Sequence, residues 1–218
     1  LRKALELEPA SLHFQFMLGM VLDYSGEAES LLDELEQGPA PVQANLDAWR
    51  YIKSAGDQMP HMTGSAIKVF QISVDAANDD GLVLEFGVRF GRSIRQISSL
   101  VDQKVHGFDS FEGLPEAWND EPDGTYTTGG LIPDVPENVT LYKGWFDATL
   151  PGFIENHPEP VRLINIDCDI YSSTMTVLAL LAQQIVPGTV IIFDEYIGGE
   201  TWRDDEFKAF HKEEALLK

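Results

Sequence analysis

The sequence has 218 residues, 44% of them hydrophobic, and its 15 Lys and Arg against 36 Asp and Glu give a formal net charge of -21. That length supports one substantial hydrophobic core with a small appendage. The negative charge would repel the phosphates of nucleic acids and of anionic membranes, so we expect neither as a partner. A single cysteine excludes an internal disulfide framework, and no secretory signal or membrane span is visible, so we expect a cytoplasmic location. The first residue is Leu1 rather than Met, which predicts a fragment of a longer protein.

Residues 1–37 have the pattern of a helical hairpin, which we take as the first domain. Pro9 and Ser11 can open a helix, Ser25 and Gly26 can end it, and residues 27–35 form a second helix. The fragments ALELEP, LG and GE resemble parts of a tetratricopeptide repeat. The alternative is an ordinary helical cap on the next domain. Helices before a core often pack between subunits, which makes a homo-oligomer through these helices one expected assembly.

The stretch from Gly38 to Pro41 predicts a linker, because two prolines in four residues disfavour a continued helix. A longer helical region follows, from Leu46 to Val74. The second domain is expected over residues 42–218.

From Gly81 onward, short apolar runs alternate with amphipathic segments. We predict strands over residues 82–86, 104–108, 139–142, 161–166 and 189–193, with helices between most of them, for example over residues 93–101 and 173–186. Strands that are apolar on both faces and alternate with helices indicate a parallel sheet in a doubly wound, Rossmann-like α/β fold. In such a fold, ligands bind beyond the carboxyl ends of the strands.

The residues after the first two predicted strands suit a nucleotide-like ligand. Gly87 and Gly91 follow the first strand, and Ser93 can cap the next helix. This spacing is not Gly-x-Gly-x-x-Gly, which disfavours a nucleotide-dependent oxidoreductase. Asp109 follows the second strand, at the position where such folds bind ribose hydroxyls.

Acidic residues follow the fourth and fifth predicted strands. Asp167 and Asp169 come after one, and Asp194 and Glu195 after the other. Because adjacent parallel strands lie about 4.8 Å apart, these carboxylates can converge, and a hard cation such as Mg²⁺ or Ca²⁺ would hold them together. Zinc fits less well, since Cys168 should point the opposite way, into the core. For Asp169, the alternative is a cap on the helix near residues 172–174.

Five motifs follow one another along the second domain: E-x-G-x-x-x-G-x-S, HGFDSFEGLPE, KGWFDATLP, INIDCDIYSST and PGTVIIFDEY. Their order resembles the macrocin O-methyltransferase family, whose members are class I S-adenosylmethionine-dependent enzymes that methylate sugar or related hydroxyls. The resemblance implies an EC 2.1.1 transferase with S-adenosyl-L-methionine and Mg²⁺ as cofactors. It assigns to the cofactor Glu85, Gly87, Gly91, Ser93, Asp109 and Ser110. It assigns to the metal Asp167, Asp194 and Glu195.

Methyl transfer to a hydroxyl also needs an acceptor for the proton. Asp167 is the candidate general base, because a residue near the metal would also lie near the reacting oxygen. Trp145 follows the third predicted strand and could flank the adenine of the cofactor; a core or rim position is the alternative.

Two features depart from the family pattern. Glu195 stands where the family usually has Asp, and the sequence after the fifth predicted strand shows no further strand, so the closing C-terminal strands are expected to be missing. The alternative function is a catalytically silent methyltransferase fold that serves as an interaction module through its N-terminal helices.

Residues 110–138 are rich in Gly, Pro and Asp and predict a long loop. We expect this loop to cover a small, hydroxylated acceptor, with Trp118 and Tyr126 as flat surfaces for a sugar or ring. The alternative is a disordered insertion.

Overall fold

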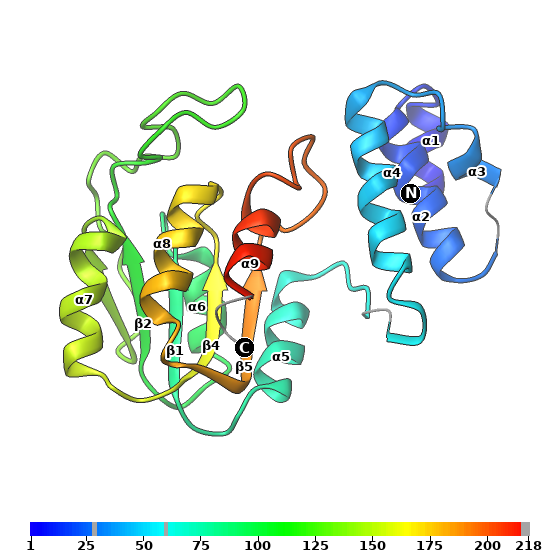
Figure 1. Cartoon of the computed structure of the whole chain (residues 1–218). Helices are drawn as coiled ribbons and strands as arrows, with labels where there is room; N and C mark the ends of the chain where they lie inside the picture. The colour runs from blue at the N-terminus through cyan, green and yellow to red at the C-terminus, as the bar shows by residue number, and fades with distance from the viewer. Residues whose placement is uncertain (28–29, 59–60, 215–218) are drawn as a thin grey trace. The chain divides into compact units, whose positions relative to one another are not determined.

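A computed structural model describes residues 1–27, 30–58 and 61–214 (Figure 1). By contact, the chain divides into two units: Leu1–His61 with Ile197–Trp202, and Met62–Tyr196 with Arg203–Lys218. The expected domain division at residues 37 and 42 stays a prediction, as does the likeness to a tetratricopeptide repeat. None of the described helices combines the length and the hydrophobicity that crossing a bilayer requires.

The first unit is built from short helices: α1 (Arg2–Leu7), α2 (Leu12–Tyr24), α3 (Ser30–Asp33) and α4 (Ala40–Lys53). As predicted, Ser11 caps α2, and its hydroxyl accepts a hydrogen bond from the amide of Phe14. The second helix of the hairpin is shorter than predicted, and residues 28–29 of that stretch lie outside the described residues.

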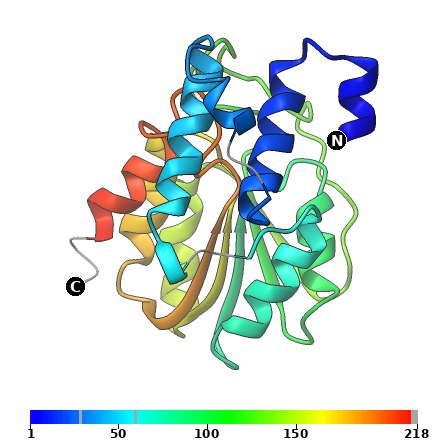
Figure 2. The same cartoon turned by 90° about the vertical axis from the view of Figure 1, so that its right-hand side faces the viewer.

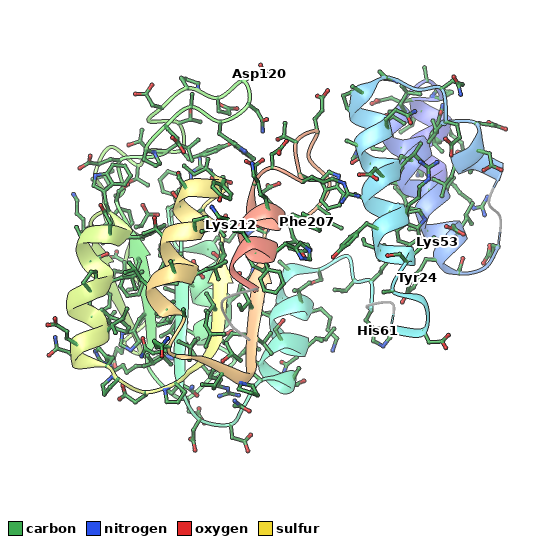
Figure 3. The ribbon with its side chains drawn as sticks, in the orientation of Figure 1. Tyr24, Lys53, His61, Asp120, Phe207 and Lys212 are labelled. Atoms are coloured by element: carbon green, nitrogen blue, oxygen red, sulfur yellow. The ribbon has the colours of Figure 1, made fainter. Side chains whose placement is uncertain are left out.

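The linker predicted at residues 38–41 is wrong, because α4 already begins at Ala40. Pro41 lies in the first turn of α4, where a missing amide hydrogen breaks no helical hydrogen bond. The helix is fixed to α2 through Asp23, which accepts from Trp49 Nε1 at 2.6 Å and from Lys53 Nζ at 2.8 Å. Figure 3 shows Tyr24 and Lys53 at neighbouring ends of these two helices.

The second unit contains a five-stranded parallel sheet, which confirms the predicted α/β fold. Its strands are β1 (Leu82–Phe86), β2 (Val105–Asp109), β3 (Val139–Lys143), β4 (Val161–Ile166) and β5 (Ile185–Phe193), in the order β3-β2-β1-β4-β5. Its helices are α5 (Ala66–Ala76), α6 (Arg92–Ser98), α7 (Phe146–Asn156), α8 (Tyr171–Leu181) and α9 (Glu206–Glu214). The helical region expected from Leu46 to Val74 contains two α-helices, α4 and α5. β5 is the last strand among the described residues and forms one edge of the sheet.

The helices cover both faces of the sheet, α5 and α6 on one side and α8 and α9 on the other (Figure 2). Two apolar clusters fill the layers. One joins Phe86, Phe108 and Ile164 to α7 and α8, and the other packs Val83 and Leu163 against α5 and α6. All five residues of β1 are buried, Glu85 included, as expected for a strand covered on both faces.

The strand order places the switch point of the sheet between β1 and β4. From β1 the chain proceeds outward through β2 and β3, and it then returns to β4 and proceeds the other way. In doubly wound sheets a crevice opens at this point, beyond the carboxyl ends of the strands.

Candidate functional site

A cavity of about 880 Å³ lies at the carboxyl ends of the central strands. Its walls come from the β1–α6 turn, the end of β2, the start of α7 and the segments that follow β4 and β5. Predicted site residues that line it are Gly87, Ser93, Asp109, Ser110, Trp145, Asp167, Asp194 and Glu195. Glu85, Gly91 and Trp118 are not among the residues that line the cavity. The volume falls within the range of small-molecule sites, about 300–1,000 Å³.

Gly87 allows the ends of β1 and β4 to pass close to each other. Its φ is +90°, and an added Cβ would lie 1.6 Å from the carbonyl oxygen of Asp167. The neighbouring amide of Asp167 donates to the carbonyl of Phe86 at 2.8 Å. This glycine is therefore required by contact with the protein's own backbone, a constraint that the sequence does not show.

The turn after Gly87 ends at Gly91, which precedes α6 in the left-handed conformation (φ +74°). The prediction that Ser93 caps this helix is wrong. Ser93 already lies inside α6, and its hydroxyl donates to Glu85 Oε1 at 2.8 Å. The serine thus joins the helix to a side chain of β1.

Glu85 is completely buried at the end of β1. Its Oε2 has no hydrogen-bond partner within the described residues. Burial raises the pKa of Glu85 well above its usual range, and the nearby charges of Asp167 and Asp109 add to that effect. Burial therefore favours the neutral, protonated form of Glu85.

Asp109 holds the β1–α6 turn. Its Oδ2 accepts from the amides of Val88 at 2.8 Å and Arg89 at 2.6 Å, and its Oδ1 accepts from the amide of Phe111 at 2.6 Å. A carboxylate has about four acceptor positions, so one remains for a ligand hydroxyl. The acid predicted to bind ribose thus also shapes the turn beside it.

Four carboxylates follow β4 and β5 and share one wall of the cavity. Asp194 directly follows β5, and its amide donates to Ile166 at the end of β4 at 3.0 Å. Burial, followed by repulsion from Asp194 and Asp169, raises the pKa of Asp167 to about 7. Burial, followed by repulsion from Glu195 and Asp194, raises the pKa of Asp169 to about 6. These acids therefore lie close enough to repel one another, as the predicted convergence requires.

The donor chemistry of this wall fits a hard cation, since Mg²⁺ prefers carboxylate oxygens. As the side chains stand, however, no group of three or more His, Cys, Asp or Glu among the described residues is arranged to hold a metal ion. Ligation by this wall therefore requires side chains to turn toward a common point. A bound cation would lower the raised pKa values again.

Asp169 does not cap α8, which corrects that alternative. The residue before the helix is Ile170, without a side-chain cap, while Asp169 has a φ of +63° and lines the cavity. Cys168, between the two aspartates, is buried and belongs to the apolar cluster against α8, as alternation predicts.

Sequence reasoning missed Arg89 and Glu206. Arg89 lines the cavity and lies over the ring of Tyr126, 5.0 Å from its centroid. Glu206, at the start of α9, is buried, and its Oε2 accepts from the amide of Glu195 at 3.0 Å. Burial raises the pKa of Glu206 to about 9. Both contacts join residues far apart in the chain, and no local motif marks them.

Residues 110–138 form an irregular segment fixed by its own hydrogen bonds. Leu114 and Gly124 are joined through Gly124 N to Leu114 O at 2.9 Å, and Glu116 accepts from Ser172 of α8 at 2.6 Å. Tyr126 lines the cavity, as predicted. Asp120 lies at the outer turn of this segment (Figure 3).

Comparison with known proteins identifies the family. Residues 84–196, just over half of the chain, match the methyltransferase domain family Methyltransf_24. The 8-demethyl-8-(2,3-dimethoxy-alpha-L-rhamnosyl)-tetracenomycin-C 4'-O-methyltransferase of Streptomyces olivaceus is 29% identical over 49% of this chain and 47% of its own length. The mycinamicin III 3''-O-methyltransferase of Micromonospora griseorubida is 25% identical over 66% of this chain and 69% of its own length. The chain thus spans about half of the first of these relatives.

Solved structures share the fold. The calicheamicin methyltransferase CalS11 superposes with a TM-score of 0.55 at 20% identity, covering 83% of this chain and 80% of that one. The O-methyltransferase NovP superposes with a TM-score of 0.51 at 21% identity, covering 69% and 72%. With its five-stranded parallel sheet, its cavity at the switch point and the match over residues 84–196, the chain belongs to the methyltransferase domain family.

Proposed function

We propose that this protein is an S-adenosylmethionine-dependent, Mg²⁺-assisted O-methyltransferase that acts on a hydroxyl of a small sugar or natural-product intermediate. The proposal rests mainly on one observation. The cofactor residues of the β1–α6 turn and the carboxylates after β4 and β5 line the same cavity. Both curated relatives are named as O-methyltransferases, one of a rhamnosyl-bearing tetracenomycin and one of a mycinamicin. A relation to the macrocin O-methyltransferases belongs to the same proposal.

Each of the proposed cofactor residues has a different role. Asp109 has one acceptor position left for a ribose hydroxyl, and the hydrogen bond between Ser93 and Glu85 supports the turn from below. Trp145 is 39% exposed at the edge of the cavity, so its ring is accessible to an adenine. Ser110 is held by its own turn, since its hydroxyl accepts from Glu112 N at 3.0 Å.

In the reaction the acceptor oxygen forms a bond to the methyl carbon as the sulfur–methyl bond of S-adenosylmethionine breaks. S-adenosylhomocysteine leaves with that electron pair and the hydroxyl loses its proton, so the step requires alignment and a base. We assign Asp167 as the base, and Asp167, Asp194 and Glu195 as the residues that would hold Mg²⁺. When bound, Mg²⁺ would supply Lewis-acid polarisation of the acceptor hydroxyl. The pKa of about 7 belongs to Asp167 without the cation, and bound Mg²⁺ would lower it, so the base role of Asp167 rests on its place beside the reacting oxygen rather than on that pKa.

Methyl transfer to a panel of sugars and glycosides, detected by mass spectrometry, tests the proposal. We expect product with S-adenosylmethionine and Mg²⁺, loss of product with a chelator, and a reduction of about 10²–10⁴-fold in Asp167→Asn. Asp102→Asn, an exposed acid outside the cavity, is the matched control and should leave turnover unchanged. A protein that binds the cofactor product but transfers no methyl group to any acceptor would favour the silent-fold alternative.

A further inference from the structure

Arg89 projects from the β1–α6 turn into the cavity, and its main chain is fixed in an uncommon conformation. Its φ is +49°, in the left-handed region that non-glycine residues seldom adopt. Its amide donates to Asp109 Oδ2 at 2.6 Å. Backbone strain of this kind persists where the surrounding structure enforces it, and it concentrates at functional sites.

Two aromatic rings hold the guanidinium of Arg89. The carbon Cζ lies 5.0 Å from the ring centroid of Tyr126 and 5.3 Å from that of Phe90. Tyr126 itself has a φ of +69°, and both residues line the cavity. Stacking on a ring leaves the N–H groups at the rim of the guanidinium free to bind a ligand.

The Arg89 guanidinium makes no hydrogen bond or ion pair with any described residue, and Asp169 attracts it only at longer range. Arg95, one turn further along, is different. Its Nη1 donates to the carbonyls of Phe90 and Gly91, each at 2.8 Å, and its role is structural. Arg89 is therefore a positioned cation with unused donors.

Arg89 is one of few positive charges in a cavity that is mainly acidic. Six carboxylates and two arginines line the wall: Asp109, Asp147, Asp167, Asp169, Asp194 and Glu195, with Arg89 and Arg92. Such a wall repels an anion everywhere except beside the arginines. An arginine presents its donors as a planar fork that matches phosphate and carboxylate oxygens.

The position of Tyr126 assigns Arg89 to the acceptor rather than to the cofactor. Apart from Ser110, the residues proposed for the cofactor come from the strand ends and the turn. Arg89 belongs to that turn, but its guanidinium stacks on Tyr126 of segment 110–138, which we expect to cover the acceptor. The guanidinium thus lies against the segment that we expect to cover the acceptor.

We propose that Arg89 binds an anionic group of the acceptor, so that the substrate class is a hydroxylated molecule with a phosphate or carboxylate, such as a sugar phosphate or a uronic acid. Tyr126 and Phe90 are positioning residues that hold the guanidinium. This inference rests on the proposed function, because it names the acceptor of the same cavity.

The test compares glucose 1-phosphate, glucuronate and uncharged methyl glucoside as probes. Their dissociation constants are measured by calorimetry on the full chain, with and without saturating S-adenosylhomocysteine. The variants are Arg89→Gln, Arg89→Lys, Tyr126→Phe and Tyr126→Ala, with Arg2→Gln as a control for the loss of one positive charge on an exposed residue. Circular dichroism checks that each variant folds.

We expect the wild-type protein to bind an anionic probe about tenfold or more tightly than methyl glucoside, as a charge-assisted contact requires. Arg89→Gln should abolish that preference, Arg89→Lys should keep only part of it, and Tyr126→Ala but not Tyr126→Phe should weaken it. Arg2→Gln should have no effect.

An anion preference that survives in Arg89→Gln, or that is absent from the wild type, would overturn the inference. So would a loss of about tenfold in S-adenosylhomocysteine affinity in Arg89→Gln, because it would assign the guanidinium to the cofactor's carboxylate. Failure of the wild type to bind S-adenosylhomocysteine counts against the proposed function instead, and the titrations without it still measure the anion preference.

Discussion

Replacing Gly87 by alanine should disrupt the junction between β1 and β4. The new Cβ would lie 1.6 Å from the carbonyl oxygen of Asp167, whereas such contacts essentially never fall below 3.0 Å. The two backbone segments, at Gly87 and at Asp167, would therefore separate by about 1.4 Å, the difference between these distances. That movement breaks the hydrogen bond from Asp167 N to Phe86 O, now 2.8 Å long.

The expected loss of unfolding free energy is about 2–5 kcal/mol. An alanine in the left-handed region costs roughly 1–2 kcal/mol, and a buried backbone group without its partner costs about 1–3 kcal/mol. Whole domains have only about 5–15 kcal/mol of stability, so Gly87→Ala should be marginally folded. Because Asp167 would be displaced, methyl transfer should fall as well.

Gly129→Ala is the matched control. Gly129 also has a positive φ, +67°, but no atom lies within 4 Å of an added Cβ. The unfolding free energy of Gly129→Ala should fall only by the cost of placing alanine in the left-handed region, about 1–2 kcal/mol. Urea unfolding followed by circular dichroism measures both variants. Equal destabilisation of the two would refute the steric argument at Gly87.

The remaining predictions concern buried titratable groups and the long segment. His106 is buried beside His157, and burial lowers its pKa from 6.5 to about 4, so its neutral form contributes stability in full above pH 6.5 that is lost as the pH falls toward 4. His106→Phe should remove up to roughly 3 kcal/mol of that pH dependence, measured by urea unfolding at pH 7 and pH 4.5, and an unchanged dependence would contradict the assignment. Glu85→Gln should keep the free energy of unfolding within about 1 kcal/mol, because burial favours the neutral carboxyl and the amide has the same shape, whereas a large loss would show that the fold needs the ionised form. Gly113→Ala should loosen segment 110–138, since an added Cβ would lie 2.4 Å from the carbonyl oxygens of Gly124 and Thr125; limited proteolysis should then cut this segment faster than in the wild type.

The sheet could be predicted from sequence because its signals are local. Each apolar run is a strand, and the predicted bounds 82–86 and 161–166 match β1 and β4. The rule that ligands bind at the carboxyl ends of parallel strands then places Asp109, Asp167 and Asp194 at one cavity without knowledge of any contact.

The details that sequence reasoning got wrong depend on contacts between distant residues. Pro41 opens α4 because that helix packs on α2 through Asp23 and Trp49, a partner far away in sequence. Ser93 bonds to Glu85 rather than capping α6, because the buried carboxyl is within reach.

The role of Arg89 could not be predicted either, because it also depends on a contact between residues that are distant in sequence. The stack of Arg89 on Tyr126 joins a tight turn to a long irregular segment, and neither has a periodic pattern. The need for glycine at position 87 comes from the backbone of Asp167, just after β4, and not from a ligand.

The most direct test of the central claim is calorimetric titration of S-adenosylhomocysteine into the protein, with and without Mg²⁺, repeated with Asp109→Ala and Asp167→Ala. The account predicts micromolar binding that is lost in Asp109→Ala, which removes both the ribose acceptor and the support of the turn, and retained in Asp167→Ala. Absence of binding by the folded wild-type protein, or full binding by Asp109→Ala, would contradict the assignment of this cavity to the cofactor.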